Sequence, residues 1–229
     1  MKSIPFHGVI LLEKSERLQF MDGTVHVALC AMAAEAFLQD LKSYYKAISK
    51  LRPYTPPRTI FNINPEPRNY GGGAVINGQM EYLKSSERNL EKLIDSLEKR
   101  SLINKYEEII KRLNGAWDKD ADELFNNLQR LITLRNKLVH IKSDEIELDE
   151  RNNVSEHPAV VRDLLGLGIL EDGRPAVSWV YMLDTEKLVS WARRTAIDII
   201  GAILKIIPDE PISNNFKYSY FNAIRTFKF

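Results

Sequence analysis

The sequence predicts an all-α fold in a single domain, and three observations lead to this prediction. Long proline-free segments place apolar residues at the three- and four-residue steps of amphipathic helices. Prolines and glycines are instead concentrated in one stretch, where five of the ten prolines lie within residues 53–67 and three glycines follow at residues 71–73. The chain of 229 residues is 44% apolar and 28% charged, which is enough apolar material for a sizeable core.

The first long helix is predicted over residues 23–51, where apolar side chains at first lie on nearly every side, as is typical of a buried helix. Cys30 is the only cysteine, so no disulfide framework or cysteine metal cluster is expected, and it is interpreted as core filler. Residues 52–78 predict a long loop or extended excursion, with room for a short strand at residues 59–63. Its glycines are not interpreted as a phosphate-binding loop, because no Gly-Lys-Ser/Thr follows them.

Helical periodicity resumes at about residue 79 and predicts a helix to residue 100. A further helix is predicted over residues 101–114, with Gly115 at its C-terminal cap. Asp120 or Asp122 is then expected to cap the next helix, which carries the segment LQRLITLRNKLVHIK.

The second half of the chain begins with an acidic, hydrophilic segment and returns to helix after it. Residues 157–170 predict a short helix with a glycine-rich turn, and residues 178–183 a short extended piece. Asp184 or Thr185 is expected to cap the last long helix, which Pro208 ends. The aromatic, basic residues 209–229 are interpreted as a tail, either bracing an interface or disordered.

Charge and hydropathy narrow the function classes. Formal net charge is +1, with 32 basic and 31 acidic residues, which argues against a broad nucleic-acid surface based on phosphate neutralisation alone. Residues 130–142 contain four basic residues and no acidic one, which fits either a local basic site or a solvated helix end. The longest apolar runs, of about 14 residues, are too short to span a bilayer, and no secretory leader is visible. A cytoplasmic protein without a membrane segment is therefore expected.

The segment at residues 128–142 places a charge inside an apolar helix face, which contains Leu128, Leu131, Ile132, Leu138 and Val139. Arg135 lies in the middle of this face, and a buried guanidinium needs an anion or a route to water. Snorkelling of the side chain is one explanation. The other is a meeting with Glu35, the only acidic residue between Asp22 and Asp40, in the most apolar helix.

Asn136 and His140 follow Arg135 on the same predicted helix. They are four residues apart and share a face, whereas His140 lies about 140° around the helix from Arg135. Arg135 and His140 would therefore cooperate by flanking a groove, or through the same helix of a second subunit.

The segment LRNKLVHIK resembles the Arg-x4-His signature of HEPN domains (higher eukaryotes and prokaryotes nucleotide-binding). In that family a polar residue, often Asn, follows the Arg. The segments AAEAFLQDL, INKYEEIIKRLNG and TEKLVSWARRTAIDIIGAILKIIP resemble a bacterial branch of the family. The resemblance covers roughly residues 20–208, which are taken as the core of one HEPN-like domain spanning residues 1–229.

The resemblance implies a helical bundle that forms a homodimer around its motif helices. Many HEPN proteins are metal-independent endoribonucleases that act as toxins or anti-phage effectors, and others bind RNA or nucleotides without cleaving them. Arg135 and His140 match the catalytic pair, Asn136 the adjoining polar position and Glu35 the acidic position of the first helix. HEPN toxins silenced by tyrosine modification carry that Tyr two residues after the His, and Lys142 stands there, so control by a partner nucleotidyltransferase is not expected.

The residue types fit RNA cleavage independently of the resemblance. A histidine can take or give a proton near neutral pH, and an arginine can bind a phosphate through two parallel hydrogen bonds. Arg130, Lys137 and Lys142 are the predicted RNA-binding cations. No cofactor is expected, and no metal, because the four histidines have no ligand-type spacing.

The predicted function is thus a metal-independent endoribonuclease of toxin or defence type, with RNA as its substrate. Its expected partners are a second copy of the chain and an antitoxin or defence partner protein. The alternative is a non-catalytic RNA-binding, nucleotide-binding or interaction domain, and an unrelated helical protein with a chance motif remains open.

Overall fold

The computed structural model describes residues 6–18, 22–51, 73–76, 79–114, 123–140, 157–171 and 178–225. Within these residues the chain forms eight α-helices, one short 3₁₀ helix and one two-stranded hairpin. The predicted all-α class is therefore confirmed.

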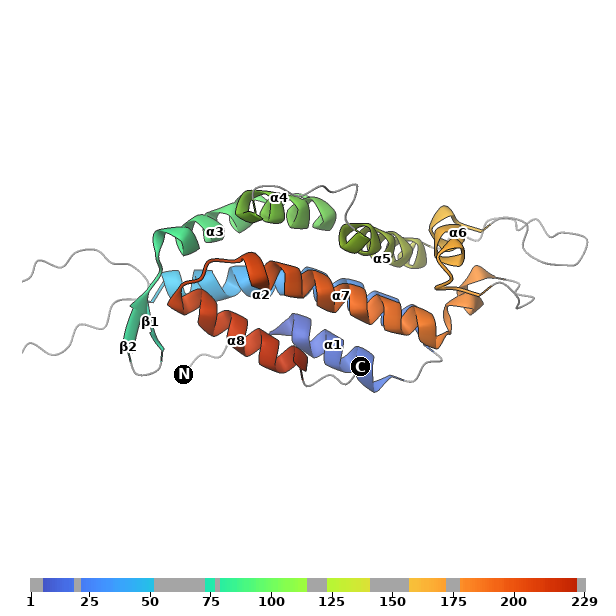
Figure 1. The fold of residues 1–229 in the computed structure, drawn as a ribbon, viewed down its shortest axis with the longest axis horizontal. Coiled ribbons are helices and arrows are strands. Elements are labelled where there is room, and N and C mark those ends of the chain that lie inside the picture. Colours follow the sequence, from blue (N-terminus) through green and yellow to red (C-terminus); the bar gives the residue numbers. More distant parts are fainter. Residues whose placement is uncertain are drawn as a thin grey trace, which may run out of the picture.

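Two long helices, α2 (Gly23–Ser49) and α7 (Glu186–Ile206), lie side by side along the length of the molecule (Figure 1). α1 (His7–Arg17) and α8 (Pro211–Arg225) lie beneath them in that view. α1 packs mainly along α2, so the N-terminal helix covers one flank of the longest helix.

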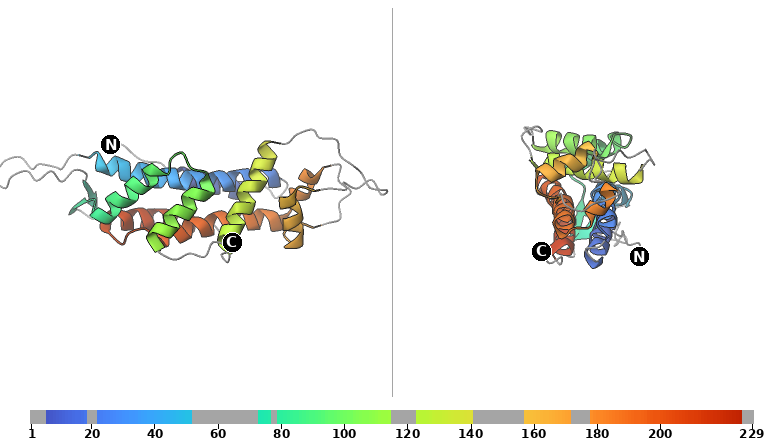
Figure 2. Two further views of the ribbon diagram at one scale, coloured as in Figure 1. Left: turned by 90° about the horizontal axis from the view of Figure 1, so that it is seen from above. Right: turned by 90° about the vertical axis from the view of Figure 1, so that its right-hand side faces the viewer.

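A third group of helices forms a layer on the other side of the α2–α7 pair. It consists of α3 (Ser85–Ser96), α4 (Leu102–Asn114) and α5 (Glu123–Val139). Seen from above, these helices cross α2 and α7 obliquely (Figure 2). α5 contacts both long helices and lies towards the end of the bundle where α6 is found (Figure 1).

The ends of the bundle are closed by small elements. At one end β1 (Gly73–Ile76) pairs antiparallel with β2 (Gln79–Tyr82), in a register that sets Gly73 opposite Tyr82. At the other end lie α6 (Ala159–Gly166) and the 3₁₀ helix η1 (Trp179–Leu183) (Figure 1). The predicted short helix and glycine turn are confirmed, since Gly168 has a φ of +68° after α6. The extended piece predicted at residues 178–183 is wrong, because this segment winds into η1.

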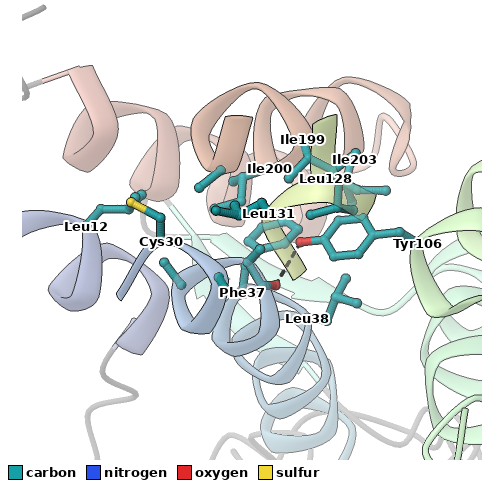
Figure 3. Close-up of a cluster of buried hydrophobic side chains, with 14 of the residues drawn as sticks. Leu12, Cys30, Phe37, Leu38, Tyr106, Leu128, Leu131, Ile199, Ile200 and Ile203 are labelled. Carbon is teal, nitrogen blue, oxygen red and sulfur yellow. Dashed lines mark hydrogen bonds between the residues drawn. The ribbon is translucent and has the colours of Figure 1, made fainter. Parts of the chain in front are cut away.

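The core lies between the three groups of helices and is shown in Figure 3. Small residues of α2 such as Ala31 and Ala34 are fully covered, which lets α4, α5 and α7 approach closely. The hydroxyl of Tyr106 on α4 donates to the carbonyl oxygen of Ala34 over 2.8 Å, so this buried phenol is satisfied. Cys30 is buried in this core, and burial raises the pKa of its thiol to about 11. Its interpretation as core filler is confirmed.

Both residues proposed as caps before the last long helix are used, for different helices. The side chain of Thr185 accepts a hydrogen bond from Leu188 N and caps α7. Asp184 Oδ1 accepts from Gly23 N over 2.9 Å and caps α2 instead. A Cβ on Gly23 would lie 1.9 Å from the carbonyl oxygen of Leu183, so only glycine allows this docking.

The interpretation of residues 209–229 as a tail is wrong for the described part, because residues 211–225 form α8. Its side chains at four-residue steps are buried in the core: Ile212, Phe216, Tyr220 and Ile224. Asp40 joins α8 to α1, since its buried carboxylate accepts from Tyr220 Oη and from Gly8 N, each over 2.9 Å. The core therefore extends on both sides of residues 20–208, because α1 also contributes Leu12.

The other differences lie around the proline-rich stretch. Helix was predicted from about residue 79 to residue 100, but residues 79–82 pair as β2 and α3 ends at Ser96. The strand suggested at residues 59–63, the caps Gly115, Asp120 and Asp122, and the basic Lys142 lie outside the described residues.

α2 is the one described helix whose length and composition would allow it to cross a membrane. This is weak evidence for a span, because 56% of the relevant window is buried inside the molecule, as in the core helix of many proteins. The predicted cytoplasmic location stays a prediction.

Candidate functional site

The motif helix α5 is buried along a stripe with three-residue steps, which consists of Phe125, Leu128, Leu131 and Leu134. The predicted apolar face is therefore displaced towards the N-terminus, because α5 crosses the long helices obliquely and its last turn extends beyond them (Figure 2). Val139, which was placed on the face, is 63% exposed. Arg135 lies at the edge of the stripe and not in its middle.

Arg135 and Glu35 do meet, although they are 100 residues apart in the chain. Arg135 Nη2 lies 3.3 Å from Glu35 Oε2 of α2, and Arg135 Nη1 donates to Asn136 Oδ1 over 3.0 Å. The side chains of Arg135 and Glu35 are 31% and 56% exposed. The pair is therefore hydrated, and a dry ion pair in the interior is excluded.

His140 is the first residue after α5, and its side chain is exposed. Its backbone N donates to the carbonyl oxygen of Asn136, and its imidazole has no hydrogen bond or ion pair with another described residue. It follows Arg135 by five residues, which corresponds to about 140° around an ideal helix axis and about 7.5 Å along it. A single chain therefore does not bring the guanidinium, which points to α2, together with the imidazole.

The predicted RNA-binding cations differ in their ion pairs and in their exposure to solvent. Arg130 Nε lies 3.3 Å from Asp163 Oδ2 of α6, and Arg130 Nη1 donates to Asn127 Oδ1. Arg130 therefore has an acidic partner at the same distance as Arg135 has, and its side chain is 25% exposed. Lys137 is exposed on the last turns of α5 and faces solvent.

Arg135 and Glu35 line a groove of about 400 Å³ between α2, α3, α4 and α5, to which α1 adds Leu11. The groove was not predicted, because its lining comes from five helices whose crossing angles the sequence does not specify. Met32, which is 43% exposed, and Lys105 of α4 also line it. Met32 lies three residues before Glu35, so its position beside the acidic residue is the one signal that the sequence contains.

No family model, curated protein or solved structure matches this chain. Within the described residues, no three His, Cys, Asp or Glu side chains are grouped as metal ligands. A function can therefore be inferred only from the arrangement of this chain's own side chains.

We expect Arg135→Ala to lower the free energy of unfolding by about 1 kcal/mol or less, because hydrated ion pairs contribute little. A dry pair would instead cost roughly 3–5 kcal/mol when one partner is removed. Urea unfolding of the variant measures the difference directly. Arg130→Ala is the matched comparison, since Arg130 lies on the same helix and also has a 3.3 Å ion pair. A loss above about 3 kcal/mol for Arg135→Ala alone would show that the pair is a structural element of the core.

Proposed function

We propose that this protein is a metal-independent endoribonuclease of the HEPN type that acts as a homodimer. The observation that supports it most is the hydrated cluster of Arg135, Asn136 and Glu35 in a groove, with an exposed His140 one and a half turns further on. A guanidinium that a carboxylate keeps at the solvent-exposed surface can still bind a phosphate. A guanidinium buried in the core cannot. The all-helical architecture agrees with a HEPN-like bundle.

The proposed reaction uses the RNA's own 2′-hydroxyl as nucleophile. The 2′-oxygen attacks the adjacent phosphorus, and the bond from phosphorus to the 5′-oxygen of the next nucleotide breaks. One histidine takes the 2′-proton, and a second proton donor protonates the leaving 5′-oxygen. Arg135 stabilises the negative charge that develops on the phosphoryl oxygens. The products are a 2′,3′-cyclic phosphate and a 5′-hydroxyl.

A dimer supplies what one chain lacks. Arg135 and His140 point in different directions around α5, so a complete site needs the guanidinium of one chain and the imidazole of another. A two-fold axis beside α5 would place each Arg135 near the partner's His140, so that each of two sites would hold one guanidinium and one imidazole. The exposed Val139 lies between these residues and would be covered in such an interface.

A binding function without cleavage is the second candidate. It is favoured by the Glu35–Arg135 ion pair, which lowers the net charge at the guanidinium, and by the near-neutral chain. In this case the same residues would hold RNA or a nucleotide while no bond breaks. A ribonuclease would further fit a toxin or defence role, with a neutralising partner protein.

Incubation of the purified protein with end-labelled RNA in EDTA tests the proposal. We expect cleavage that leaves 2′,3′-cyclic phosphate or 3′-phosphate ends, because neither the nucleophile nor the proton transfers require a metal. A substrate with 2′-O-methyl groups is the matched control and should stay intact. Binding of RNA without any cleavage, across many sequences, would favour the second candidate.

A further inference from the structure

The groove beside Arg135 has the size and the mixed apolar and charged lining of a site for a small ligand. Its volume of about 400 Å³ lies within the range of small-molecule sites, roughly 300–1,000 Å³. Its apolar lining includes Met32 and Ala36 of α2, and Leu97, Leu102 and Ile109 of the α3–α4 segment.

One positive charge in the lining of this groove has no acidic partner among the described residues and can bind an anion. Lys42, Lys105 and Arg135 line it together with two acidic residues, Glu35 and Glu98. Lys42 is already bound, because its Nζ lies 2.9 Å from Asp95 and 3.3 Å from Glu98. Lys105 has no ion pair with any residue that the structure describes, so its charge is available to a ligand.

We propose that the groove holds one unpaired base of the RNA, with neighbouring backbone phosphates on Arg135 and Lys105. This inference rests on the proposed ribonuclease function and specifies its substrate. A base has flat apolar faces and fits against the Met32 thioether, which contacts aromatic rings favourably. A base within a duplex is stacked and paired and does not reach such a groove. The substrate is therefore single-stranded RNA, or an unpaired loop of a folded RNA.

NMR of methyl-¹³C-methionine protein tests the position of the base. The full chain with His140→Ala is titrated with a short single-stranded RNA, so that binding is observed without cleavage. We expect an upfield shift of the Met32 methyl, which lies in the groove. Met182, which is buried in the core with 4% of its surface exposed, is the internal control, and its methyl signal should not shift. Inorganic phosphate and ribose 5-phosphate, which carry no base, should leave Met32 unshifted.

Two substitutions test the groove by affinity. Leu102→Trp fills it and should weaken RNA binding roughly tenfold, since stacking of one base on a protein side chain has an effect of this order. Lys105→Ala should lower the salt slope of the binding constant by about 0.7, the value for one phosphate contact with a single strand. Leu167→Trp and Lys92→Ala make the same changes at exposed positions outside the groove and should have neither effect.

The outcomes separate this inference from the proposed function. If RNA is cleaved in EDTA but Met32 does not shift and Leu102→Trp binds normally, the base subsite is wrong and the ribonuclease stands. If Met32 shifts but wild-type protein never cleaves, the subsite stands and the catalytic proposal is wrong. A shift of Met32 that inorganic phosphate reproduces would overturn the subsite, because an anion alone would explain it. Absence of RNA binding would also overturn it.

Discussion

We expect replacement of His140 by alanine to lower the rate of the proposed RNA cleavage by about 10²–10⁴-fold, the usual contribution of one general acid–base group. The imidazole is exposed at the end of α5 and has no hydrogen bond with another described residue, so nothing in the fold depends on it. The free energy of unfolding should therefore change by less than about 0.5 kcal/mol, as for surface substitutions in general. The cleavage rate and the urea unfolding curve of the same preparation are the two measurements.

His7→Ala is the matched control for this variant. It also removes an exposed imidazole, one that lies 3.4 Å from Asp40 at the start of α1 and outside the candidate site. We expect its cleavage rate to remain within about twofold of wild type, because His7 takes part in no proton transfer of the proposed reaction. A loss below tenfold for His140→Ala would reject this histidine as a catalytic residue.

Replacement of Glu87 by alanine should lower the free energy of unfolding by roughly 3–5 kcal/mol, more than we expect for Arg135→Ala. This carboxylate is fully buried, and Oε1 accepts from Ser213 N over 2.8 Å and from Ser213 Oγ over 2.7 Å. Oε2 accepts from Lys84 N over 2.9 Å. Glu87 thus lies at the N-termini of both α3 and α8, where the helix dipoles favour a negative charge. Its removal takes the acceptor away from the buried Ser213 N and from the part-buried Lys84 N, and leaves Ser213 Oγ with Tyr45 Oη as its other partner.

Glu91→Ala is the control, one turn further along α3. Its carboxylate is half-buried and accepts one hydrogen bond, from Ser49 Oγ over 3.0 Å. We expect a loss of about 1 kcal/mol for this variant, in line with a single, partly hydrated hydrogen bond. Equal losses for the two variants in urea unfolding would show that the paired helix N-termini do not depend on Glu87.

The sequence predicted those helices for which both the apolar pattern and the residues that begin and end the helix can be recognised locally in the sequence. α2 and α7 have long apolar patterns, and Thr185 and Pro208 bound α7 as expected. α8 was missed although Phe216 and Tyr220 are four residues apart, because their aromatic character and position at the end of the chain suggested a tail. The hairpin was missed because Gln79–Tyr82 is a short segment, and its pairing with Gly73–Ile76 depends on tertiary contacts that the local sequence does not specify.

For the candidate site, the sequence predicted the contact between Glu35 and Arg135, because each charge was unusual in its own apolar helix. For a catalytic arginine, a partly exposed head beside Glu35 was expected rather than a dry ion pair, and the exposures of 31% and 56% confirm this expectation. Lys105 and Leu102 were not singled out, since an ordinary helix face carries such residues and only the packing of α4 beside α2 makes them part of a groove.

We expect each RNA-cleaving site to combine Arg135 of one chain with His140 of its partner. Arg135→Ala and His140→Ala chains carrying different tags can be co-expressed, and the mixed dimer purified and assayed in EDTA beside both parent homodimers. Light scattering should give a mass near twice 26.4 kDa for all three species. We expect the mixed dimer, which keeps one complete site of two, to recover about half of the wild-type activity while both parents are nearly inactive. A mixed dimer as inactive as its parents, or a chain that stays monomeric and cleaves RNA fully, would contradict it.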